Sequence, residues 1–518
     1  MRHFTSYGPP DPKKHFTVER KKLVEKCLKN LIGDPPEDGG YFFTIWAPRQ
    51  TGKTWLINRV VTEIKNRYPD KFLIADISVE NLFSEEKIEL LDIIIETICR
   101  RLKIEYKEIK KEREFERFFF KGKVIEKPLI LIIDEVDCLR GEVLEYLMHS
   151  FRKMYLYRED YILHGLALVG VRAVLGVEAE RGSPFNIQRS LKVENFSYEE
   201  VKDLFEQYQR ESGQKVEEEV IRLVYEKTDG QPGLVGWFGE LLTEKYNPGV
   251  DKPIDKKLWD KVYIKALYVE PNNTVLNIIK KAFRYKEEVL KIYQRDDVKF
   301  SFSIDWCNYL YMHGVIREEE GVEYPVCRIA NEFIQARLFD ALSGEYGRIP
   351  GPYLEPLDTL DDVLKENCIK VKPLIERFKK YLERTKSKDI YKGKEVRRSN
   401  GRIYESIYHF YLYTWIFEVL KDYEVRVIPE FPLGNGRIDI VIKDKKENIS
   451  IIEVKSFINI AKLKKGKEQL ESYAKKLKAK EALMALFVDF DEERYLKAIK
   501  EEYEKESIKF YIEPIVIL

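Results

Sequence analysis

Hydrophobic positions in the first 195 residues form short, nearly continuous apolar runs that alternate with amphipathic helical patterns. The apolar runs lie at 41–46, 72–77, 128–133 and 166–171. The helical patterns lie at 18–32, 55–67 and 84–104. Continuous apolar strands that alternate with helices are typical of a parallel sheet with both faces covered. The pattern therefore predicts an α/β fold for this part of the chain.

Beyond residue 195, the pattern becomes mainly helical. Residues 197–247 are helical with a break at 229–233, and residues 255–342 are mainly helical with a short hairpin pattern at 314–328. Helices followed by a small hairpin predict a winged helix. Three glycines and three prolines in 344–356 predict a linker.

After the linker, the pattern predicts helices and then a second set of strands. The expected strands lie at about 424–428, 437–443, 449–454 and 483–488, with a helix at 462–480. Two to four domains are expected for 518 residues, because a single hydrophobic core stops growing well below that length.

Charge and cysteine usage narrow the class of protein. The 90 Lys and Arg residues nearly cancel the 89 Asp and Glu residues, so any basic surface must be local. The six cysteines lie far apart without a Cys-x-x-Cys pair, which predicts isolated core thiols in a reducing compartment and no zinc site or disulfide framework. The chain shows no signal-peptide pattern and no apolar stretch of membrane-spanning length, so we expect a cytoplasmic protein without a membrane partner.

The first apolar run leads directly into Ala47-Pro-Arg-Gln-Thr-Gly-Lys-Thr54, and a helix follows. This matches the phosphate-binding pattern G-x-x-x-x-G-K-[ST], with Ala47 in place of the first glycine, which costs little if φ stays negative. Backbone N–H groups of such a loop bind phosphate oxygens. Lys53 would neutralise the β- and γ-phosphates of ATP, and the Thr54 hydroxyl would bind Mg²⁺. The residues expected to bind nucleotide here are Arg49, Gln50, Thr51, Gly52, Lys53 and Thr54.

A matching acidic strand end occurs further along the chain. The apolar strand that begins at Leu129 ends in Asp134 and Glu135. Asp134 would hold the water shell of the ATP-bound Mg²⁺, and Glu135 would orient or deprotonate the attacking water. A charged strand terminus alone is common in α/β proteins. The loop and the acidic strand in this order nevertheless predict nucleotide binding.

These motifs resemble those of AAA+ and related STAND ATPases over about residues 10–245. The resemblance implies that Gly230-Gln-Pro232 is the lid turn that touches the nucleotide, so Pro232 joins the nucleotide site. It also implies assembly into homo-oligomers and an arginine finger that reaches a neighbouring subunit. Candidates for the finger are Arg172, Arg181 and Arg189.

A second set of polar residues lies near the C-terminus. One predicted strand delivers Asp439, and the next delivers Glu453 and, two residues on, Lys455. Residues two apart on a strand point to the same face, and strand pairing can bring Asp439 beside them. Carboxylates beside an ammonium are unfavourable in a core unless a cation lies between the acids. Mg²⁺ prefers such oxygen ligands and would polarise a phosphoryl oxygen and activate water, while Lys455 orients the nucleophile or neutralises charge.

This order of elements resembles the PD-(D/E)xK nuclease superfamily over roughly 373–518, although Ile438 and not Pro precedes Asp439. The resemblance implies a catalytic metal held by Asp439 and Glu453, with a further acid from the preceding helix, which Glu405 matches.

The resemblance extends to the neighbouring helices. It implies that Gln469, in the helix after the site, approaches the metal, with Tyr473 packed nearby. Helical spacing places His409 beside Glu405, where a structural role is the ordinary interpretation. An unrelated solvated hairpin is the alternative interpretation of the whole set.

Basic residues cluster on both sides of this set. Residues 384–402 contain eight Lys and Arg against two acids, and residues 461–480 contain eight Lys against two. These runs would neutralise the phosphates of a nucleic acid, although solubilising helix faces are the alternative.

Together the patterns predict an α/β protein with a P-loop, AAA+-like parallel sheet, a helical lid, a winged-helix-like middle domain and a C-terminal α/β PD-(D/E)xK nuclease fold. The expected boundaries are 1–195 for the ATPase core, 196–250 for the lid, 251–343 for the middle domain, 344–372 for the linker and 373–518 for the nuclease-like domain.

The expected function is that of an ATP-binding and ATP-hydrolysing, Mg²⁺-dependent endonuclease, with Mn²⁺ as an alternative metal at the nuclease site. Its substrate would be nucleic acid, with DNA favoured, and nucleotide state would gate assembly or cleavage. Defence against foreign DNA or mobile-element biology would suit such a protein. The alternative is a signalling or scaffold ATPase whose C-terminal domain binds nucleic acid without cutting it.

Overall fold

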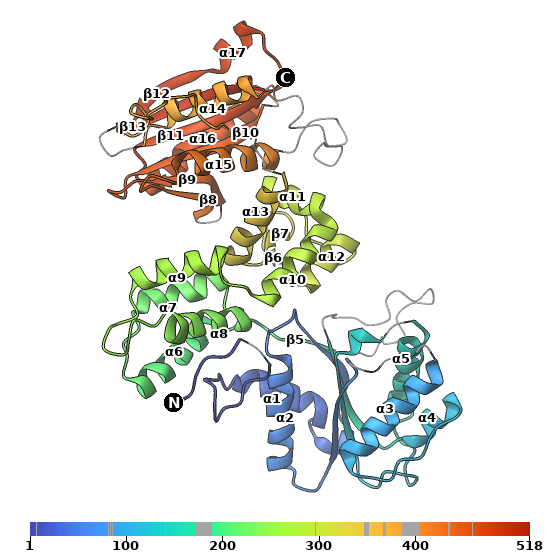
Figure 1. The fold of residues 1–518 in the computed structure, drawn as a ribbon. Helices are drawn as coiled ribbons and strands as arrows, with labels where there is room; N and C mark the ends of the chain where they lie inside the picture. Colours follow the sequence, from blue (N-terminus) through green and yellow to red (C-terminus); the bar gives the residue numbers. More distant parts are fainter. Residues whose placement is uncertain are drawn as a thin grey trace. The chain divides into compact units, whose positions relative to one another are not determined.

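The computed structural model divides into two compact units (Figure 1). Unit 1 comprises Met1–Glu270 with Met312–Gly314, and unit 2 comprises Pro271–Tyr311 with Val315–Leu518. The structure describes residues 1–6, 8–80, 82, 84, 86–139, 141–170, 189–295, 297–346, 352–365, 369–385, 405–433, 436–457 and 459–517.

The core of unit 1 is a five-stranded, all-parallel sheet with the order β2-β3-β4-β1-β5. Its strands are β1 (Phe42–Trp46), β2 (Leu73–Ser78), β3 (Leu129–Asp134), β4 (Leu163–Gly170) and β5 (Arg189–Lys192). In register, Thr44 of β1 lies opposite Leu168 of β4 and Ser190 of β5. The four strands predicted from the apolar runs, and the α/β parallel sheet they imply, are confirmed.

Helices cover both faces of this sheet, as the alternation along β3 shows. Ile130 and Ile132 pack with α1 and α2, whereas Leu131 and Ile133 pack with the helices on the opposite face. The covering helices are α1 (Lys21–Ile32), α2 (Lys53–Arg67), α3 (Lys87–Leu102), α4 (Glu112–Phe118) and α5 (Gly141–Leu156), with a 3-10 turn η1 (Pro36–Asp38) before β1 and another, η2 (Val136–Cys138), after β3.

The predicted helix at 18–32 begins three residues late, at Lys21. Arg20 has a φ of 47°, in the left-handed region, which a right-handed helix does not include. The helices α4 and α5 and the short strand β5 extend the predicted set.

The remainder of unit 1 is helical, as the sequence predicts. Its helices are α6 (Tyr198–Ser212), α7 (Glu218–Thr228), α8 (Pro232–Glu240), the π-helical turn η3 (Leu241–Lys245) and α9 (Lys256–Tyr268). A capping box between Ser197 and Glu200 starts α6, and Pro232 occupies the first turn of α8. The break between α7 and α8 thus coincides with the predicted turn.

Unit 2 begins with a helical segment that contains one hairpin. We call residues 271–311 and 315–346 the middle segment. Its elements are α10 (Asn273–Ala282), η4 (Phe283–Tyr285), α11 (Lys286–Gln294), α12 (Asp305–Met312), β6 (Ile316–Glu319), β7 (Val326–Ile329) and α13 (Glu332–Tyr346). The strands β6 and β7 pair antiparallel, so the predicted hairpin is confirmed.

The C-terminal part of unit 2 is built on a six-stranded mixed sheet with the order β12-β13-β11-β10-β9-β8. Its strands are β8 (Arg426–Leu433), β9 (Gly436–Lys443), β10 (Ile449–Ser456), β11 (Glu481–Val488), β12 (Glu501–Lys505) and β13 (Ile508–Val516). The strands β10, β11 and β13 run parallel, and the other neighbours pair antiparallel. The strands β12 and β13 extend the predicted set.

Helices cover both faces of this sheet (Figure 1). These helices are α14 (Val371–Arg384), α15 (Glu405–Leu420) and α16 (Ile460–Leu477), and a short α17 (Glu493–Ile499) precedes β12. Along β11, Met484 packs with α16, whereas Phe487 stacks on Tyr408 of α15 and contacts Phe378 of α14. Because neighbouring strand residues alternate in direction, α16 lies on one face and α14 and α15 lie on the other.

The middle segment packs directly against this C-terminal part. Phe339 of α13 lies against the rings of His409, Phe410 and Tyr413 of α15, at centroid distances of 4.8, 4.9 and 5.1 Å. Through these aromatic contacts, α13 of the middle segment packs directly on α15 of the C-terminal part.

One pair of cysteines corrects the expectation of isolated thiols. Cys307 of α12 and Cys327 of β7 are both fully buried, and their Sγ atoms are 3.6 Å apart. The two residues are twenty positions apart in the chain, and only the fold brings their thiols together.

Candidate nucleotide site and candidate metal centre

The predicted phosphate-binding loop lies between β1 and α2. Ala47 is buried, its N–H donates to Gly170 O at 3.3 Å, and its φ is not positive, so alanine fits at this position. Left-handed backbone occurs instead at Gln50, with a φ of 58°, and at Gly52, with a φ of 89°. The helix α2 begins at Lys53, so its first amides, which have no partner within the helix, lie at the end of the loop. Such a helix start favours an anion.

Lys53 fills the centre of the loop. Its Nζ donates to Ala47 O at 2.8 Å and to Pro48 O at 2.9 Å, and only 7% of the side chain is exposed. Burial lowers the pKa of Lys53, although the nearby carboxylates of Glu135 and Asp134 act in the opposite direction. The Thr51 hydroxyl also donates to Pro48 O, at 2.8 Å. The ammonium is thus held by two neutral carbonyls, an arrangement in which an anionic ligand would be favoured.

The acidic end of β3 faces the start of α2. Thr54 Oγ1 donates to Asp134 Oδ2 at 3.3 Å, and Asp134 Oδ1 accepts the N–H of Glu135 at 2.9 Å. Glu135 itself has a φ of 57°, in the left-handed region. Burial raises the pKa of both acids, and the charge of Asp134 raises that of Glu135 further. The structure therefore brings Lys53, Thr54, Asp134 and Glu135 into one cluster.

The turn before α8, which was predicted to touch the nucleotide, contacts the loop directly. The N–H of Gly233 donates to Gln50 O at 3.0 Å, and Gln231 Nε2 donates to Arg49 O at 3.4 Å. A Cβ atom at Gly233 would lie 2.5 Å from Gln50 Oε1, so glycine permits this close approach. Pro232 between them lines the same space as the loop.

A half-enclosed cavity of about 120 Å³ lies beside the loop. The sequence analysis did not predict this cavity. Its walls are largely apolar and come from the N-terminal segment, the loop, α2 and the lid. They include Phe4, Phe16, Val18, Trp55, Phe196 and Pro232. A largely apolar cavity next to the predicted phosphate-binding loop suits a nucleoside base. The aromatic residues of the Gly- and Pro-rich N-terminus were the available signal.

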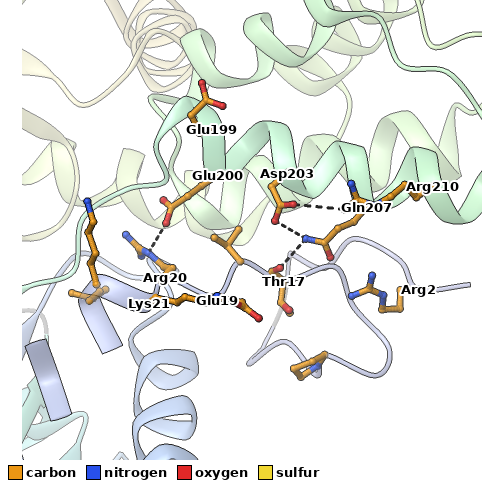
Figure 2. A pocket seen from close by; sticks show the side chains of 14 residues that line it. Arg2, Thr17, Glu19, Arg20, Lys21, Glu199, Glu200, Asp203, Gln207 and Arg210 are labelled. Atoms are coloured by element: carbon orange, nitrogen blue, oxygen red, sulfur yellow. Dashed lines mark hydrogen bonds and ion pairs between the residues drawn. The ribbon is translucent and has the colours of Figure 1, made fainter. Parts of the chain in front are cut away.

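A more open groove lies where the N-terminal segment meets α6 (Figure 2). Arg20 pairs with Glu200 at 3.6 Å, and Gln207 Nε2 donates to Thr17 O at 3.0 Å and to Asp203 Oδ2 at 2.8 Å. These polar contacts attach the N-terminal segment to α6. Charges of both signs line the groove, so it does not favour either an anion or a cation.

Replacing Gly52 by Ala is expected to weaken ATP binding about tenfold, because alanine in left-handed backbone costs about 1–2 kcal/mol and shifts the loop. No atom lies within 4 Å of a Cβ atom at Gly52, so strain and not a clash causes the effect. Gly122→Ala is a matched control, with a φ of 68° and equally open space. Calorimetric titration with ATP should separate the variants, and equal affinities would contradict the assignment.

Three carboxylates gather around one ammonium in the C-terminal sheet. Lys455 Nζ lies 3.2 Å from Glu453 Oε2, 3.8 Å from Asp439 Oδ2 and 3.9 Å from Glu405 Oε1. Two of the acids are also held by backbone, because Val454 N donates to Asp439 Oδ2 and Ser456 N donates to Glu405 Oε2, both at 2.6 Å. The set combines β9, β10 and the start of α15.

The charges in this cluster do not balance. Burial, followed by the charge of Asp439, raises the pKa of Glu453 to about 8. Burial acts to lower the pKa of Lys455, but Asp439, Glu453 and Glu405 outweigh it and hold that pKa well above its ordinary value. Glu453 is 1% exposed, and its Oε1 has no hydrogen-bond partner among the described residues. Three acids around one cation, with an orphaned buried oxygen, fit a divalent cation.

The remaining predicted residues of this region lie as follows. Gln469 Nε2 donates to Tyr473 Oη at 2.8 Å, one turn further along α16, so the structure pairs these two residues with each other. His409 does not pair with Glu405; its Nε2 donates to Asp439 O at 2.8 Å. Its Nδ1 lies 3.1 Å from Glu430 Oε1, an acid that sequence reasoning missed.

Several predicted residues lie outside the part of the chain that the structure describes. These are Arg172 and Arg181, the side chain of Arg189, and most of the basic run at 384–402. The second basic run lies on α16 and the residues after it, where Lys462, Lys464 and Lys465 are exposed.

Comparison with known proteins agrees with part of this picture. Residues 5–246 match the family described as AAA-like domain, and residues 369–492 match a domain of unknown function. No curated protein matches the chain. The N-terminal region is therefore an AAA-like P-loop ATPase domain.

The solved structures that match the chain include proteins of three organisms. A Walker-type ATPase of Pyrococcus abyssi is 16% identical, with a TM-score of 0.42, over 64% of this chain and 98% of that one. Cdc6p from Pyrobaculum aerophilum is 14% identical, with a TM-score of 0.36, over 66% and 98%. RuvB of Thermotoga maritima is 14% identical, with a TM-score of 0.35, over 62% and 94%. Likenesses at this level establish nothing about activity.

Among the described residues, no helix is both long enough and apolar enough to cross a membrane.

Proposed function

We propose that this chain is an ATP-binding, Mg²⁺-dependent nuclease that cleaves nucleic acid, with DNA as the favoured substrate. The single observation that carries the proposal is the cluster of Glu405, Asp439 and Glu453 around Lys455, with the orphaned oxygen of Glu453 inside it. Buried acids that outnumber the nearby cations are unfavourable, and a divalent cation would offset their excess negative charge.

Asp439, Glu453 and Glu405 would hold Mg²⁺, or Mn²⁺ in its place. When bound, such an ion polarises a phosphoryl oxygen and lowers the pKa of a bound water. The backbone N–H groups of Val454 and Ser456 orient two of these carboxylates, which fixes the ligand set before substrate arrives.

Lys455 would act as a fixed positive charge. The surrounding carboxylates keep its Nζ protonated, so it donates to a phosphate oxygen or to the attacking water and does not remove a proton. The exposed lysines of α16 follow β10 in the chain and would bind the flanking phosphates, which makes binding dependent on salt.

Nucleotide would bind at the loop of unit 1. Lys53 and the loop residues Arg49, Gln50, Thr51 and Gly52 would contact the phosphates, and Thr54 and Asp134 would hold Mg²⁺. Glu135 would orient the attacking water, and the apolar cavity that reaches Pro232 would hold the base. We propose that ATP regulates cleavage or assembly into homo-oligomers. A role in defence against foreign DNA or in mobile-element biology stays a prediction.

Metal removal tests the proposal. Protein stripped with a chelator should leave supercoiled plasmid intact, and added Mg²⁺ or Mn²⁺ should restore nicking, because the three acids have no catalytic role without a cation. Gel retardation of the same DNA measures binding and so distinguishes a nuclease from a protein that binds DNA without cutting it. Binding without cleavage at any metal concentration would support a scaffold ATPase and would contradict the nuclease.

A further inference from the structure

Asp439 is held from two directions. Its carboxylate accepts the N–H of Val454, and its backbone carbonyl accepts His409 Nε2 at 2.8 Å. A carbonyl oxygen only accepts, so Nε2 of His409 carries the proton and its Nδ1 faces Glu430. The position of the Asp439 backbone therefore depends on a residue of α15.

His409 is the inner end of a buried chain of polar contacts. Its Nδ1 lies 3.1 Å from Glu430 Oε1, and Glu430 Oε2 pairs with Arg437 Nε and accepts from Gln335 Nε2, both at 3.0 Å. His409 is 4% exposed and Glu430 is 5% exposed. Buried charges are costly unless they keep their partners. This series of contacts therefore holds the side chains of His409 and Glu430 in one arrangement.

The series of polar contacts ends at Arg437, which binds the middle segment. Arg437 Nη2 donates to Ile292 O at 2.7 Å and to Tyr293 O at 2.6 Å. These carbonyls belong to the last turn of α11, where the helix offers them no partner and where a cation is favoured. The guanidinium also lies 5.4 Å from the ring centroid of Tyr293, whose hydroxyl donates to Gln335 O of α13 at 2.6 Å.

We propose that His409, Glu430 and Arg437 are positioning residues for the metal centre, and that α11 and α13 of the middle segment are part of its scaffold. This inference rests on the proposed function. A shift of α11 or α13 removes partners from Arg437 and Glu430, and His409 then no longer fixes the backbone of Asp439. The middle segment is by this argument inseparable from the metal centre, and a conformational signal that moved it would change metal binding.

A second metal site is the competing explanation, because ligand atoms of His409, Glu430 and Asp439 lie within 4.8 Å of one another. Arg437 already lies 3.0 Å from Glu430 and would repel a further cation. The guanidinium therefore makes this set of ligand atoms unfavourable for a second metal ion.

Two variants of the full-length protein test the inference. Glu430→Gln keeps the shape and removes the charge, and Gln335→Leu removes the contact from the middle segment without touching the C-terminal sheet. Glu345→Gln is the control on the same helix, because its ion pair with Lys286 is a surface contact. Without nucleotide, calorimetry should show Mn²⁺ binding about tenfold weaker in both test variants and unchanged in the control.

Two further readouts separate positioning from general stability. The kcat of cleavage should fall with the KM for DNA unchanged, and the amides of β9 should exchange hydrogen faster only in the test variants. If the wild-type protein neither binds Mn²⁺ nor cleaves DNA, the proposed function is wrong. Faster hydrogen exchange in β9 of the test variants would still support the contacts from His409 through Glu430 to Arg437. Wild-type cleavage together with Mn²⁺ affinities and exchange rates equal to those of Glu345→Gln would overturn the inference.

Discussion

Replacing Asp439 by Asn is expected to slow metal-dependent cleavage by at least about 100-fold, with the fold retained. Asn keeps the size of the side chain and still accepts the N–H of Val454, but it removes the negative charge of one of the three acids around Lys455. The contact with His409 uses the backbone carbonyl of Asp439 and is preserved. The rate of conversion of supercoiled to nicked plasmid at saturating Mg²⁺ measures the effect.

Asp491→Asn provides the matched control, since Asp491 is exposed and follows β11 in the same domain. Lys455→Ala should lose about 100- to 1,000-fold in rate, because a fixed charge in a water-poor site acts on the transition state. Wild-type rates in both Asp439→Asn and Lys455→Ala would place the cleavage site elsewhere.

Replacing Lys53 by Ala is expected to weaken ATP binding by about 3 kcal/mol, or somewhat more than 100-fold. The ammonium is the one buried cation in the described loop, and its present partners are the neutral carbonyls of Ala47 and Pro48. Phosphate oxygens would give it stronger, charge-assisted partners. Fluorescent ATP-analogue titration measures the loss.

Lys65→Ala is the control, because Lys65 is exposed on the same helix α2. The Lys53→Ala protein should keep its Mn²⁺ affinity at the C-terminal site, since that site lies in the other unit. Unchanged ATP affinity would reject the phosphate-binding loop.

The sequence predicted the strands of the first sheet whose apolar runs are continuous, because burial on both faces leaves a direct record in the residues. It did not reveal β13, an inner strand whose apolar run is interrupted by Lys509, Glu513 and Pro514. It did not reveal β5, whose four residues Arg-Ser-Leu-Lys contain one apolar side chain. Nor did it reveal β12, an edge strand of sequence Glu-Glu-Tyr-Glu-Lys that is largely exposed. Charged edge strands resist unwanted pairing, and the same composition hides them from a hydrophobic pattern.

The residues of the candidate sites also differ in whether a local sequence pattern could reveal them. Glu453 and Lys455 follow from the period of a strand, and Lys53 from a motif. Glu430 and Arg437 could not be found in this way, because their partners come from elements far away in sequence and Glu430 has a left-handed φ of 50°. The expected approach of Gln469 to the metal remains a prediction, and the structure shows its amide donating to Tyr473.

The position of β13 bears on how the protein is made. Residues 508–516 form an inner strand, paired with β11 on one side and β12 on the other, so the second sheet cannot close until they have left the ribosome. The first sheet needs only residues up to 192. Because domains fold as they emerge, the first sheet should form early in synthesis, and the acidic cluster should acquire its shape only after residues 508–516 have emerged.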